Sequence, residues 1–415
     1  MKRRQFLART ASLVALPFLN PSAEETGTAI AGYAGRMEYG LKVAGPVTFR
    51  AAISLARPAT EVRIIFGHGS LRAARIDKFA LSSGNAVEQI STCHGWTVGT
   101  LGGSPKASLP PAAGERRRRM IKSDWMPVPD GEASVIFVSA FCPDARGLRL
   151  IGARGGSRLI AHWAGHSTRP RLYQHSAGDH LTGFLPDIEA KATSIIVGVE
   201  YRTRHSVRTC LVFGDSIDNA EGRDVLLPGA DAAFVASQAT GDGTVAWETL
   251  NLAWSGATSV RIAQHVADAI EDDVLGDMAI VPLGSPNDAR KGFRSSVASL
   301  EQLHNQNLAA LEAAGVSVLS RTWAPTNRSI KKFGHGDELR RQYNAKYVKC
   351  RPNHIFDADA VLSGEEIFEQ VQFREGYTSD GIHPNDRGIA ALADQLRYKL
   401  DEFANVSRSL RSSRR

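Results

Sequence analysis

The chain has 415 residues, of which 43% are hydrophobic and 22% are charged, proportions that are typical of a globular protein and exclude a largely disordered one. Part of the net charge of +7 lies in short clusters at the two ends and at Arg116 to Arg119 rather than along one face with interleaved aromatic residues, which argues against a nucleic-acid-binding protein. No apolar stretch after the first twenty residues is long enough to serve as a membrane anchor, and the length predicts two domains.

The first residues have the pattern of an export signal. A basic start is followed by a short apolar stretch over residues 11–19 and then by small residues. The sequence RRQFL at residues 3–7 resembles the twin-arginine signal, which the twin-arginine translocase reads as its partner during export. We therefore expect residues 1–31 to form a signal peptide and leader, cleaved after Ala23 or Ala31, and the mature protein to be periplasmic or secreted.

Residues 32–205 are rich in short runs of Val, Ile and Phe that Gly, Pro and Ser interrupt. Such runs are VTFRAAI, EVRIIFG, ASVIFVSAF and SIIVGVEY. Short strands with turn residues between them, and little helical periodicity, predict an N-terminal antiparallel β-sandwich or jelly-roll domain.

Neither the histidines nor the cysteines of the chain have a convincing metal-binding pattern. His162 and His166 have a spacing that suits two ligands on a helix, but Gly165 and the β-rich surroundings argue for a structural role. The four cysteines lack metal-type spacing, and an exported protein permits either a Cys93 to Cys142 disulfide or buried thiols; they are Cys93, Cys142, Cys210 and Cys350. The sequence predicts no metal and no cofactor.

From residue 206 to residue 405 strands alternate with amphipathic helices. This alternation predicts an α/β domain of three layers, with a five-stranded parallel sheet in flavodoxin-like order. The predicted strands are TCLVFG, WETLNLA, DMAIVPLG, VSVLSRTW and HIFDA, and the predicted helices cover residues 259–270, 296–314, 337–348 and 387–403. Residues 406–415 are predicted to be a basic, disordered tail.

Two short motifs in this second domain suggest nucleophilic catalysis. Gly214-Asp215-Ser216-Ile217 follows the first strand, where the glycine allows a sharp turn that presents the serine hydroxyl. Near the end of the chain, Asp380 and His383 lie three residues apart in SDGIHP. A histidine whose second ring nitrogen is held by a carboxylate can take the proton of a serine.

Two further segments follow the second and third strands, where an oxyanion site would have to be built. They are NLAWSG, which ends at Gly256, and GSPND, which contains Asn287. Backbone and carboxamide N–H groups stabilise the negative oxygen of a tetrahedral intermediate. Trp254 suits either the lining of an acyl pocket or the core, and Asp215 is the other candidate for substrate binding.

Together the four segments resemble the blocks of the SGNH or GDSL hydrolase family, in the same order, over residues 207–404. The resemblance implies that Ser216 is the nucleophile, His383 the base and Asp380 its orienting partner. It further implies an oxyanion hole made by the amides of Ser216 and Gly256 and the side chain of Asn287. Two departures are the extra residue in Gly-Ser-Pro-Asn-Asp, where the family has Gly-x-Asn-Asp, and Ile217 in place of leucine.

The competing α/β-hydrolase fold needs Gly-x-Ser-x-Gly, but this chain has Asp218 in the place of the last glycine. The sequence therefore predicts an exported serine esterase acting on an acylated carbohydrate or a lipid. A carbohydrate acetylesterase is the first expectation, because the chain combines an export signal with a β-rich first domain. A lipase or lysophospholipase is the alternative, and a non-catalytic glycan-binding protein with a degenerate hydrolase domain is the third reading.

Overall fold

The computed structural model describes residues 27–33, 45–70, 72–112, 119–146, 148, 151–152, 171–185, 193–219, 232–239, 245–289, 296–326, 336–367 and 370–412. The predicted export signal up to residue 26, the pair His162 and His166, and Arg116 to Arg118 lie outside these ranges. No helix within the described ranges is long and apolar enough to cross a bilayer. Within the same ranges, no three or more His, Cys, Asp or Glu side chains lie together so that they could hold a metal ion.

One large sheet runs through the molecule, and its strands follow the order β19-β18-β17-β15-β16-β1-β14-β3-β8, with β9 paired to β3. Its first five strands are parallel; they are β15 (Val207–Val212), β16 (Ala246–Asn251), β17 (Met278–Pro282), β18 (Ser317–Arg321) and β19 (Ile355–Phe356). Four of these strands are buried along nearly their whole length, as expected for strands that helices cover on both faces. The carboxyl ends of these strands form the edge where loops meet.

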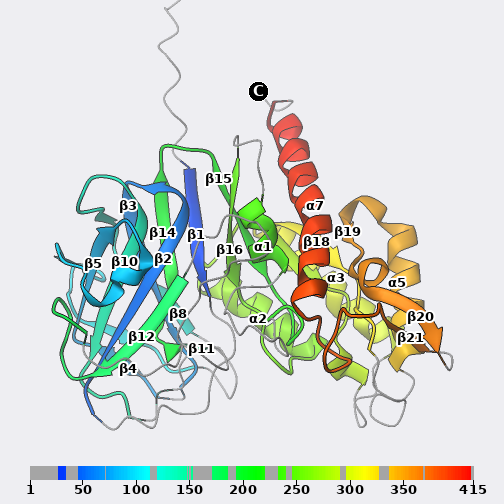
Figure 1. Ribbon diagram of the computed structural model, residues 1–415, viewed down its shortest axis with the longest axis horizontal. Coiled ribbons are helices and arrows are strands. Elements are labelled where there is room, and N and C mark those ends of the chain that lie inside the picture. The colour runs from blue at the N-terminus through cyan, green and yellow to red at the C-terminus, as the bar shows by residue number, and fades with distance from the viewer. Residues whose placement is uncertain are drawn as a thin grey trace, which may run out of the picture.

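The remaining strands of this sheet come from the N-terminal part of the chain. They are β1 (Gly27–Tyr33), β3 (Glu61–His68), β8 (Arg119–Lys122), β9 (Met126–Pro127) and β14 (Ile196–Thr203). β1 pairs in parallel with β16 and antiparallel with β14, and it thus joins the two parts of the sheet. The boundary expected at residue 205 therefore falls in the turn between β14 and β15, two strands of one sheet (Figure 1).

A second, antiparallel sheet packs on the N-terminal part of the large one. Its strands, in order, are β12 (Arg171–Ala177), β2 (Val47–Ala59), β10 (Ala133–Cys142), β5 (Lys78–Gly84) and β6 (Thr97–Val98). β2 contacts β14, β1 and β16, and one hydrophobic core extends through both sheets. The β-rich part is thus layered, but it is not the separate domain that the sequence predicts, because one of its layers continues into the parallel sheet.

Among the described residues there are also three small pairs of strands. They are β4 (Ala74–Ile76) with β7 (Ala107–Leu109), β11 (Ile151–Gly152) with β13 (Thr193–Ser194), and β20 (Ser363–Ile367) with β21 (Gln370–Phe373). In the part of the chain that the structure describes, three short 3-10 helices lie in the connections: η1 (Val87–Ser91), η2 (Pro286–Ala289) and η3 (Pro352–His354). Of these, η2 carries the third motif of the candidate site.

The leader predicted at residues 1–31 overlaps β1. Ala29, Ile30 and Ala31 are buried in the core, and Ile30 N donates a hydrogen bond to Thr209 Oγ1 of β15 at 2.7 Å. Cleavage after Ala31 would therefore remove most of a strand from the middle of the sheet, whereas cleavage after Ala23 would leave it whole. The sequence does not mark this strand, because GTAIAGY is short and rich in small residues.

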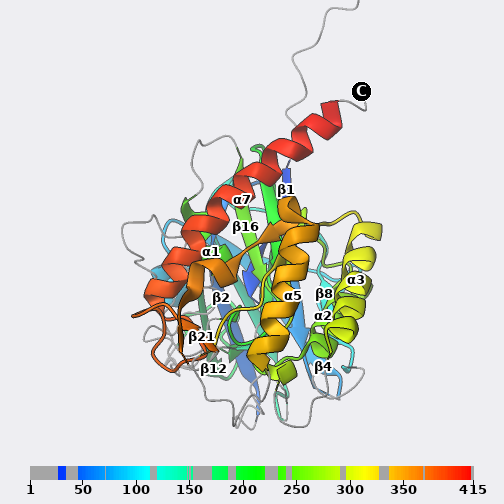
Figure 2. The ribbon, with the colours of Figure 1, turned by 90° about the vertical axis from the view of Figure 1, so that its right-hand side faces the viewer.

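Helices cover both faces of the parallel half. They are α1 (Ala232–Ala239), α2 (Ser259–Glu271), α3 (Val297–Ala313), α5 (Gly336–Cys350), α6 (Ala358–Leu362) and α7 (Asp386–Ser412). α1 packs against α7 on one face and α2 against α3 on the other, as Figure 2 shows. In α2 the buried residues Ile262, Val266 and Ala269 recur at helical spacing, which is the pattern that predicts this helix.

The C-terminal helix is longer than expected. The sequence predicts a helix over 387–403 and a disordered tail over 406–415, but α7 continues to Ser412. No glycine or proline follows Phe403 to end the helix, so the arginine-rich residues continue it.

All four cysteines are free thiols; Cys93, Cys142 and Cys210 are buried and Cys350 is exposed. Of the two alternatives left open by the sequence, the structure has the buried thiols, without a Cys93 to Cys142 bridge. Burial raises the pKa of Cys93 to about 11 and that of Cys142 to about 12, so both stay protonated at neutral pH.

Candidate active site

Ser216 lies at the carboxyl end of β15, in the middle of the parallel half of the sheet. The chain leaves the strand through Phe213 and Gly214, and the Ser216 side chain reaches the surface with 9% of the residue exposed. A Cβ atom at Gly214 would lie 1.8 Å from Asp218 Oδ2, so only glycine fits this turn. The predicted sharp turn after the first strand is therefore present, and its tightness has a steric cause.

Asp380 and His383 lie in one tight loop before α7. Asp380 Oδ1 accepts hydrogen bonds from the backbone N–H groups of Ile382 and His383, both at 2.8 Å. Thr378 Oγ1 donates to the carbonyl oxygen of His383 at 2.8 Å and accepts from Gly381 N at 2.9 Å. The loop thus holds its own conformation before any contact with the rest of the site.

The imidazole of His383 connects this loop to Ser216 across 167 residues of sequence. Its Nδ1–H donates to Asp380 Oδ2 at 2.6 Å, which leaves the lone pair on Nε2. Ser216 Oγ donates to that Nε2 at 2.8 Å. The three predicted residues therefore form one hydrogen-bonded relay, with the geometry that a serine nucleophile needs.

Asp380 is partly buried, which alone would favour its neutral form. The N–H groups of the His383 backbone, the His383 ring and the Ile382 backbone outweigh that effect and hold the pKa of Asp380 below its usual range. Asp380 is therefore ionised at neutral pH and suited to stabilise a positive charge on His383.

Gly256 and Asn287 lie in two loops that contact each other. Asn287 Nδ2 donates to the carbonyl oxygen of Ala257, the residue after Gly256, at 3.0 Å. Gly256 has a φ of 79°, a left-handed conformation that favours glycine. The two predicted sources of oxyanion contacts are thus neighbours, despite the extra residue in Gly-Ser-Pro-Asn-Asp, and their role in catalysis stays a prediction.

The extra residue is accommodated by η2 and by Asp288. The Asp288 carboxylate accepts hydrogen bonds from Ser259 N at 2.9 Å, Ser259 Oγ at 2.6 Å and Ser285 N at 2.9 Å. Burial raises the pKa of Asp288, while these hydrogen bonds oppose the rise. Asp288 thereby ties the Asn287 turn to the start of α2.

The two predicted substrate-binding residues are both buried. Asp215 has no exposed surface and binds inward, to Ile217 N at 2.8 Å and to the hydroxyl of Ser285. It supports the nucleophile turn and does not face a substrate. Trp254 is 7% exposed and stacks on His265 with ring centroids 5.0 Å apart, so of its two readings the structure supports a core aromatic.

A buried ion pair, which no sequence motif indicates, lies next to the nucleophile turn. Arg321, the last residue of β18, donates to Asp218 Oδ2 at 2.8 Å, and Asp215 N donates to the same oxygen at 3.3 Å. Burial raises the pKa of Asp218 to about 6; the charge of Arg321 opposes this rise and that of Asp215 adds to it. The pair anchors the turn of Ser216 to a neighbouring strand.

Three side chains support the site in ways that the sequence motifs do not indicate: Ser285, Arg321 and Thr378. Ser285 and Arg321 follow or end strands at the same edge of the sheet, and Thr378 lies just ahead of Asp380. Position at the carboxyl end of a strand is the one sequence signal that could have marked the first two.

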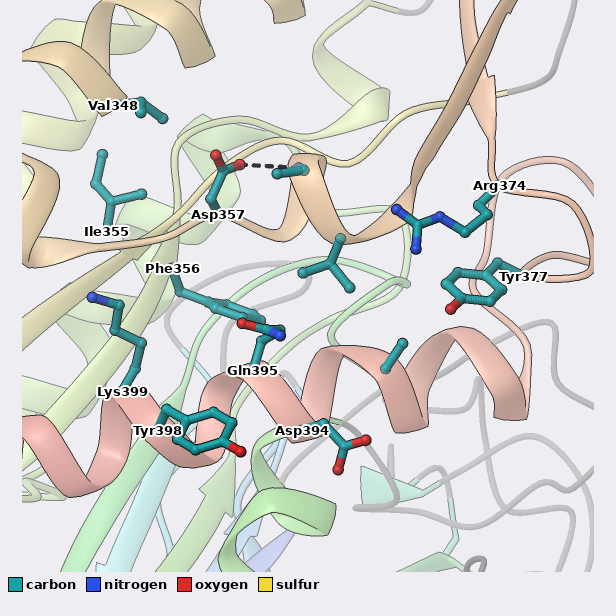
Figure 3. A pocket seen from close by; sticks show the side chains of 13 residues that line it. Val348, Ile355, Phe356, Asp357, Arg374, Tyr377, Asp394, Gln395, Tyr398 and Lys399 are labelled. Atoms are coloured by element: carbon teal, nitrogen blue, oxygen red, sulfur yellow. Dashed lines mark hydrogen bonds between the residues drawn. The ribbon is translucent and has the colours of Figure 1, made fainter.

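A cavity of about 650 Å³ lies between β19, α6 and α7. In Figure 3, Arg374 and Tyr377 border it on one side and Asp394 and Tyr398 of α7 on the other. None of the relay residues lines this cavity, whose Tyr377 directly precedes the loop of Asp380 and His383.

The chain matches no protein-family model and no curated protein sequence. Its structure is similar in part to a GDSL-like lipase from Bacteroides thetaiotaomicron, with 14% identity and a TM-score of 0.37 over 47% of this chain and 88% of that one. A lipase/acylhydrolase from Enterococcus faecalis is 15% identical, with a TM-score of 0.38 over 46% and 95% of the two chains. A Bacillus subtilis protein is 12% identical, with a TM-score of 0.36 over 85% and 80%. GDSL-type hydrolases are thus among the proteins that this chain is similar to, as its motifs indicate.

Proposed function

We propose that the protein is a serine ester hydrolase that acts through an acyl-enzyme. The observation that carries this proposal is the relay of Ser216, His383 and Asp380, with contacts of 2.8 Å and 2.6 Å. A hydroxyl donating to an imidazole that a carboxylate orients is the arrangement that turns a weak nucleophile into an effective one.

In the first half of the reaction Ser216 Oγ bonds to the ester carbonyl carbon while its proton passes to His383 Nε2. The carbonyl oxygen becomes negative, and the amides of Ser216 and Gly256 and the side chain of Asn287 are the proposed donors to it. The bond from carbon to the leaving alcohol then breaks, and that alcohol takes the proton from His383. Asp380 stabilises the imidazolium in between.

In the second half a water molecule attacks the acyl-enzyme. His383 accepts a proton from the water, the carbon bonds to the water oxygen, and the bond to Ser216 Oγ breaks. His383 returns its proton to Ser216, and the carboxylic acid leaves. Every proton in this cycle is carried by Ser216, His383, the substrate or water, so the proposed reaction needs no cofactor.

We further propose that the substrate is an acetylated carbohydrate outside the cytoplasm. This proposal is supported by the twin-arginine pattern at residues 3–7, which indicates export of the folded chain, together with the β-rich first part of the chain. A lipase or lysophospholipase remains the second candidate, favoured by the same relay. The relay is also the observation that speaks against a non-catalytic glycan-binding protein.

A series of p-nitrophenyl esters from acetate to palmitate distinguishes the two enzymatic candidates. For an acetylesterase we expect kcat/KM to fall by about tenfold or more from acetate to butyrate, because each methylene that the acyl site excludes is worth about 1–3 kcal/mol. A value of kcat/KM that rises with chain length to octanoate or palmitate would instead establish the lipase. Release of acetate from acetylated xylan provides the matching test on a carbohydrate.

A further inference from the structure

Asn251 is the last residue of β16 and the first of the segment that carries Gly256, residues 251–256. The residue is 1% exposed. Its carboxamide oxygen Oδ1 accepts a hydrogen bond from Ala253 N at 2.8 Å, within the Gly256 segment. Its carboxamide nitrogen Nδ2 donates to the carbonyl oxygen of Asp218, the second residue after Ser216, at 2.9 Å. One buried side chain therefore joins the Gly256 segment to the nucleophile turn.

Two backbone hydrogen bonds tie the Gly256 segment to the chain ahead of Ser216. Their lengths are 2.8 and 3.0 Å, their donors are the N–H groups of Leu252 and Trp254, and their acceptors are the carbonyl oxygens of Val212 and Gly214. Both acceptors precede Ser216, whereas Asp218 follows it. The nucleophile turn is therefore held against the Gly256 segment on both sides of the serine, by backbone groups ahead of it and by the Asn251 side chain behind it.

Gly256 is the third residue of a tight turn that Ala257 N closes by donating to the carbonyl oxygen of Trp254 at 3.0 Å. In the part of the chain that the structure describes, the backbone N–H groups of Gly256 and Ser216 donate to no protein acceptor. They follow β16 and β15, two neighbouring parallel strands, and therefore lie at one edge of the sheet. Backbone N–H groups with as little exposure as Ser216 are normally paired, which favours a ligand oxygen as their acceptor.

We propose that Asn251 is a positioning residue that holds the Gly256 N–H in register with the Ser216 N–H, so that both donate to the oxyanion. This inference rests on the proposed esterase function. Asn251 acts through the Gly256 segment and through Asp218, and it does not touch the substrate. Donors stabilise an oxyanion strongly only when their orientation is fixed before the charge forms. Without Asn251 the nucleophile turn would be tied to the Gly256 segment only ahead of the serine.

The Asn251→Ala variant should fold, because the backbone bonds to Val212 and Gly214 do not involve the side chain. We expect its kcat for p-nitrophenyl acetate to fall by about tenfold to a hundredfold, with KM changed by less than about twofold, since one oxyanion donor is misplaced rather than removed. The inhibition constant of a boronic acid, whose adduct with Ser216 is tetrahedral and negative, should rise by the same factor as kcat falls.

Asn251→Ser separates the two hydrogen bonds of the side chain. A serine hydroxyl can accept from the N–H two residues further on, as Asn251 does from Ala253, but it is one bond too short to reach the Asp218 carbonyl oxygen. We therefore expect the serine variant to lose as much kcat as the alanine variant. A serine variant with the kcat of the wild type would show that only the local turn matters, and it would overturn the positioning role.

Asn344→Ala is the matched control for the loss of a buried carboxamide. Asn344 is 4% exposed, and its side chain binds the N–H and the carbonyl oxygen of Trp323, two residues after β18, at 2.9 and 2.8 Å. We expect this variant to lower the thermal unfolding midpoint about as much as Asn251→Ala does, because each loses hydrogen bonds to buried backbone groups. Its kcat should stay within about twofold of the wild type, since no oxyanion donor moves. An equal loss of kcat in the two variants would reduce Asn251 to a structural residue and overturn the inference.

The boronic acid distinguishes failure of this inference from failure of the proposed function. If the wild type hydrolyses esters and binds the boronic acid, but Asn251→Ala changes neither kcat nor the inhibition constant, the positioning role is overturned and the esterase remains. A wild-type protein that neither hydrolyses esters nor binds the boronic acid would instead overturn the proposed function, and this inference with it.

Discussion

Ser216→Ala should lower kcat for p-nitrophenyl acetate by about 10⁴-fold to 10⁶-fold, because the hydroxyl that forms the acyl-enzyme is gone and only binding and the oxyanion site remain. The substitution removes one atom from a side chain at the surface of the site, where the residue is 9% exposed. The thermal unfolding midpoint should therefore stay close to that of the wild type. Activity assays of the purified wild type and variant measure kcat, and thermal melts of the same samples measure the unfolding midpoint.

A loss of activity with an unchanged melt would locate the chemistry at Ser216. Turnover of the alanine variant at the wild-type rate would end the proposal of an acyl-enzyme, even if the protein proved to be a hydrolase. An unchanged KM for the residual activity would further show that the hydroxyl contributes to reaction and not to binding.

Arg321→Ala should destabilise the fold by about 3–5 kcal/mol, because it leaves the buried Asp218 carboxylate without its cation. The two side chains are only 5% and 6% exposed, and the nitrogen-to-oxygen distance is 2.8 Å. Activity should fall as well, since Asp218 Oδ2 also receives Asp215 N beside the nucleophile. Guanidinium unfolding at fixed pH measures the loss of stability.

The loss should depend on pH in a definite direction. Asp218 has a pKa of about 6 in the folded protein, above the ordinary value of 3.8. Between pH 3.8 and pH 6 the folded state therefore binds more protons than the unfolded state. As the pH rises through this range, Asp218 increasingly disfavours folding. Without Arg321 its pKa rises further, and this destabilisation extends to higher pH. The variant should therefore lose more stability at pH 8 than at pH 5.

Arg341→Ala is the control for this effect. Its guanidinium pairs with Asp337 at 3.2 Å and Glu366 at 3.4 Å, but the Arg341 side chain is 40% exposed. Ion pairs in contact with water contribute about 1 kcal/mol or less. Two outcomes would show that the buried pair does not hold the turn. Arg321→Ala could be as stable as Arg341→Ala, or Arg321→Ala could lose the same stability at pH 5 and at pH 8.

The relay residues could be predicted from the sequence because each depends on a local signal. Gly214 to Ser216 directly follow an apolar strand, and Asp380 and His383 belong to one loop whose hydrogen bonds are internal. Parallel strands bring their carboxyl ends to one edge, which places Ser216 there. The loop of Asp380 and His383 follows the β20–β21 pair rather than a strand of the parallel sheet, so only the structure shows that it reaches the same edge. The two motifs meet where Ser216 Oγ lies 2.8 Å from His383 Nε2.

The pairing of the β-rich part could not be predicted in the same way. Periodicity identifies β14 and β16 as strands, but it does not reveal that β1 lies between them. β1 itself is a short run of small residues. It directly follows the export pattern, so most of it falls in the predicted leader. Sheet partners are chosen by long-range burial, and the register of Gly32 with Leu250 has no local signature.

The buried polar pairs that support the site could not be predicted from the sequence for a related reason. Asp218 and Arg321 are separated by 103 residues, and Ser285 and Asp215 by 70, so no spacing rule connects them. Each is an ordinary turn or strand-end residue until the fold buries it. Burial then makes a partner obligatory, because an unpaired polar group in the interior costs free energy.

Activation of Ser216 by His383 is tested most directly by the rate of covalent labelling with a fluorophosphonate. A serine reacts with this reagent at an appreciable rate only when a base takes its proton. We expect the wild type to be labelled at Ser216, identified by peptide mass spectrometry, and His383→Ala to be labelled about 10³-fold more slowly, a factor typical of losing the base. A wild-type protein that stays unlabelled, or a His383→Ala variant labelled at the wild-type rate, would contradict the account.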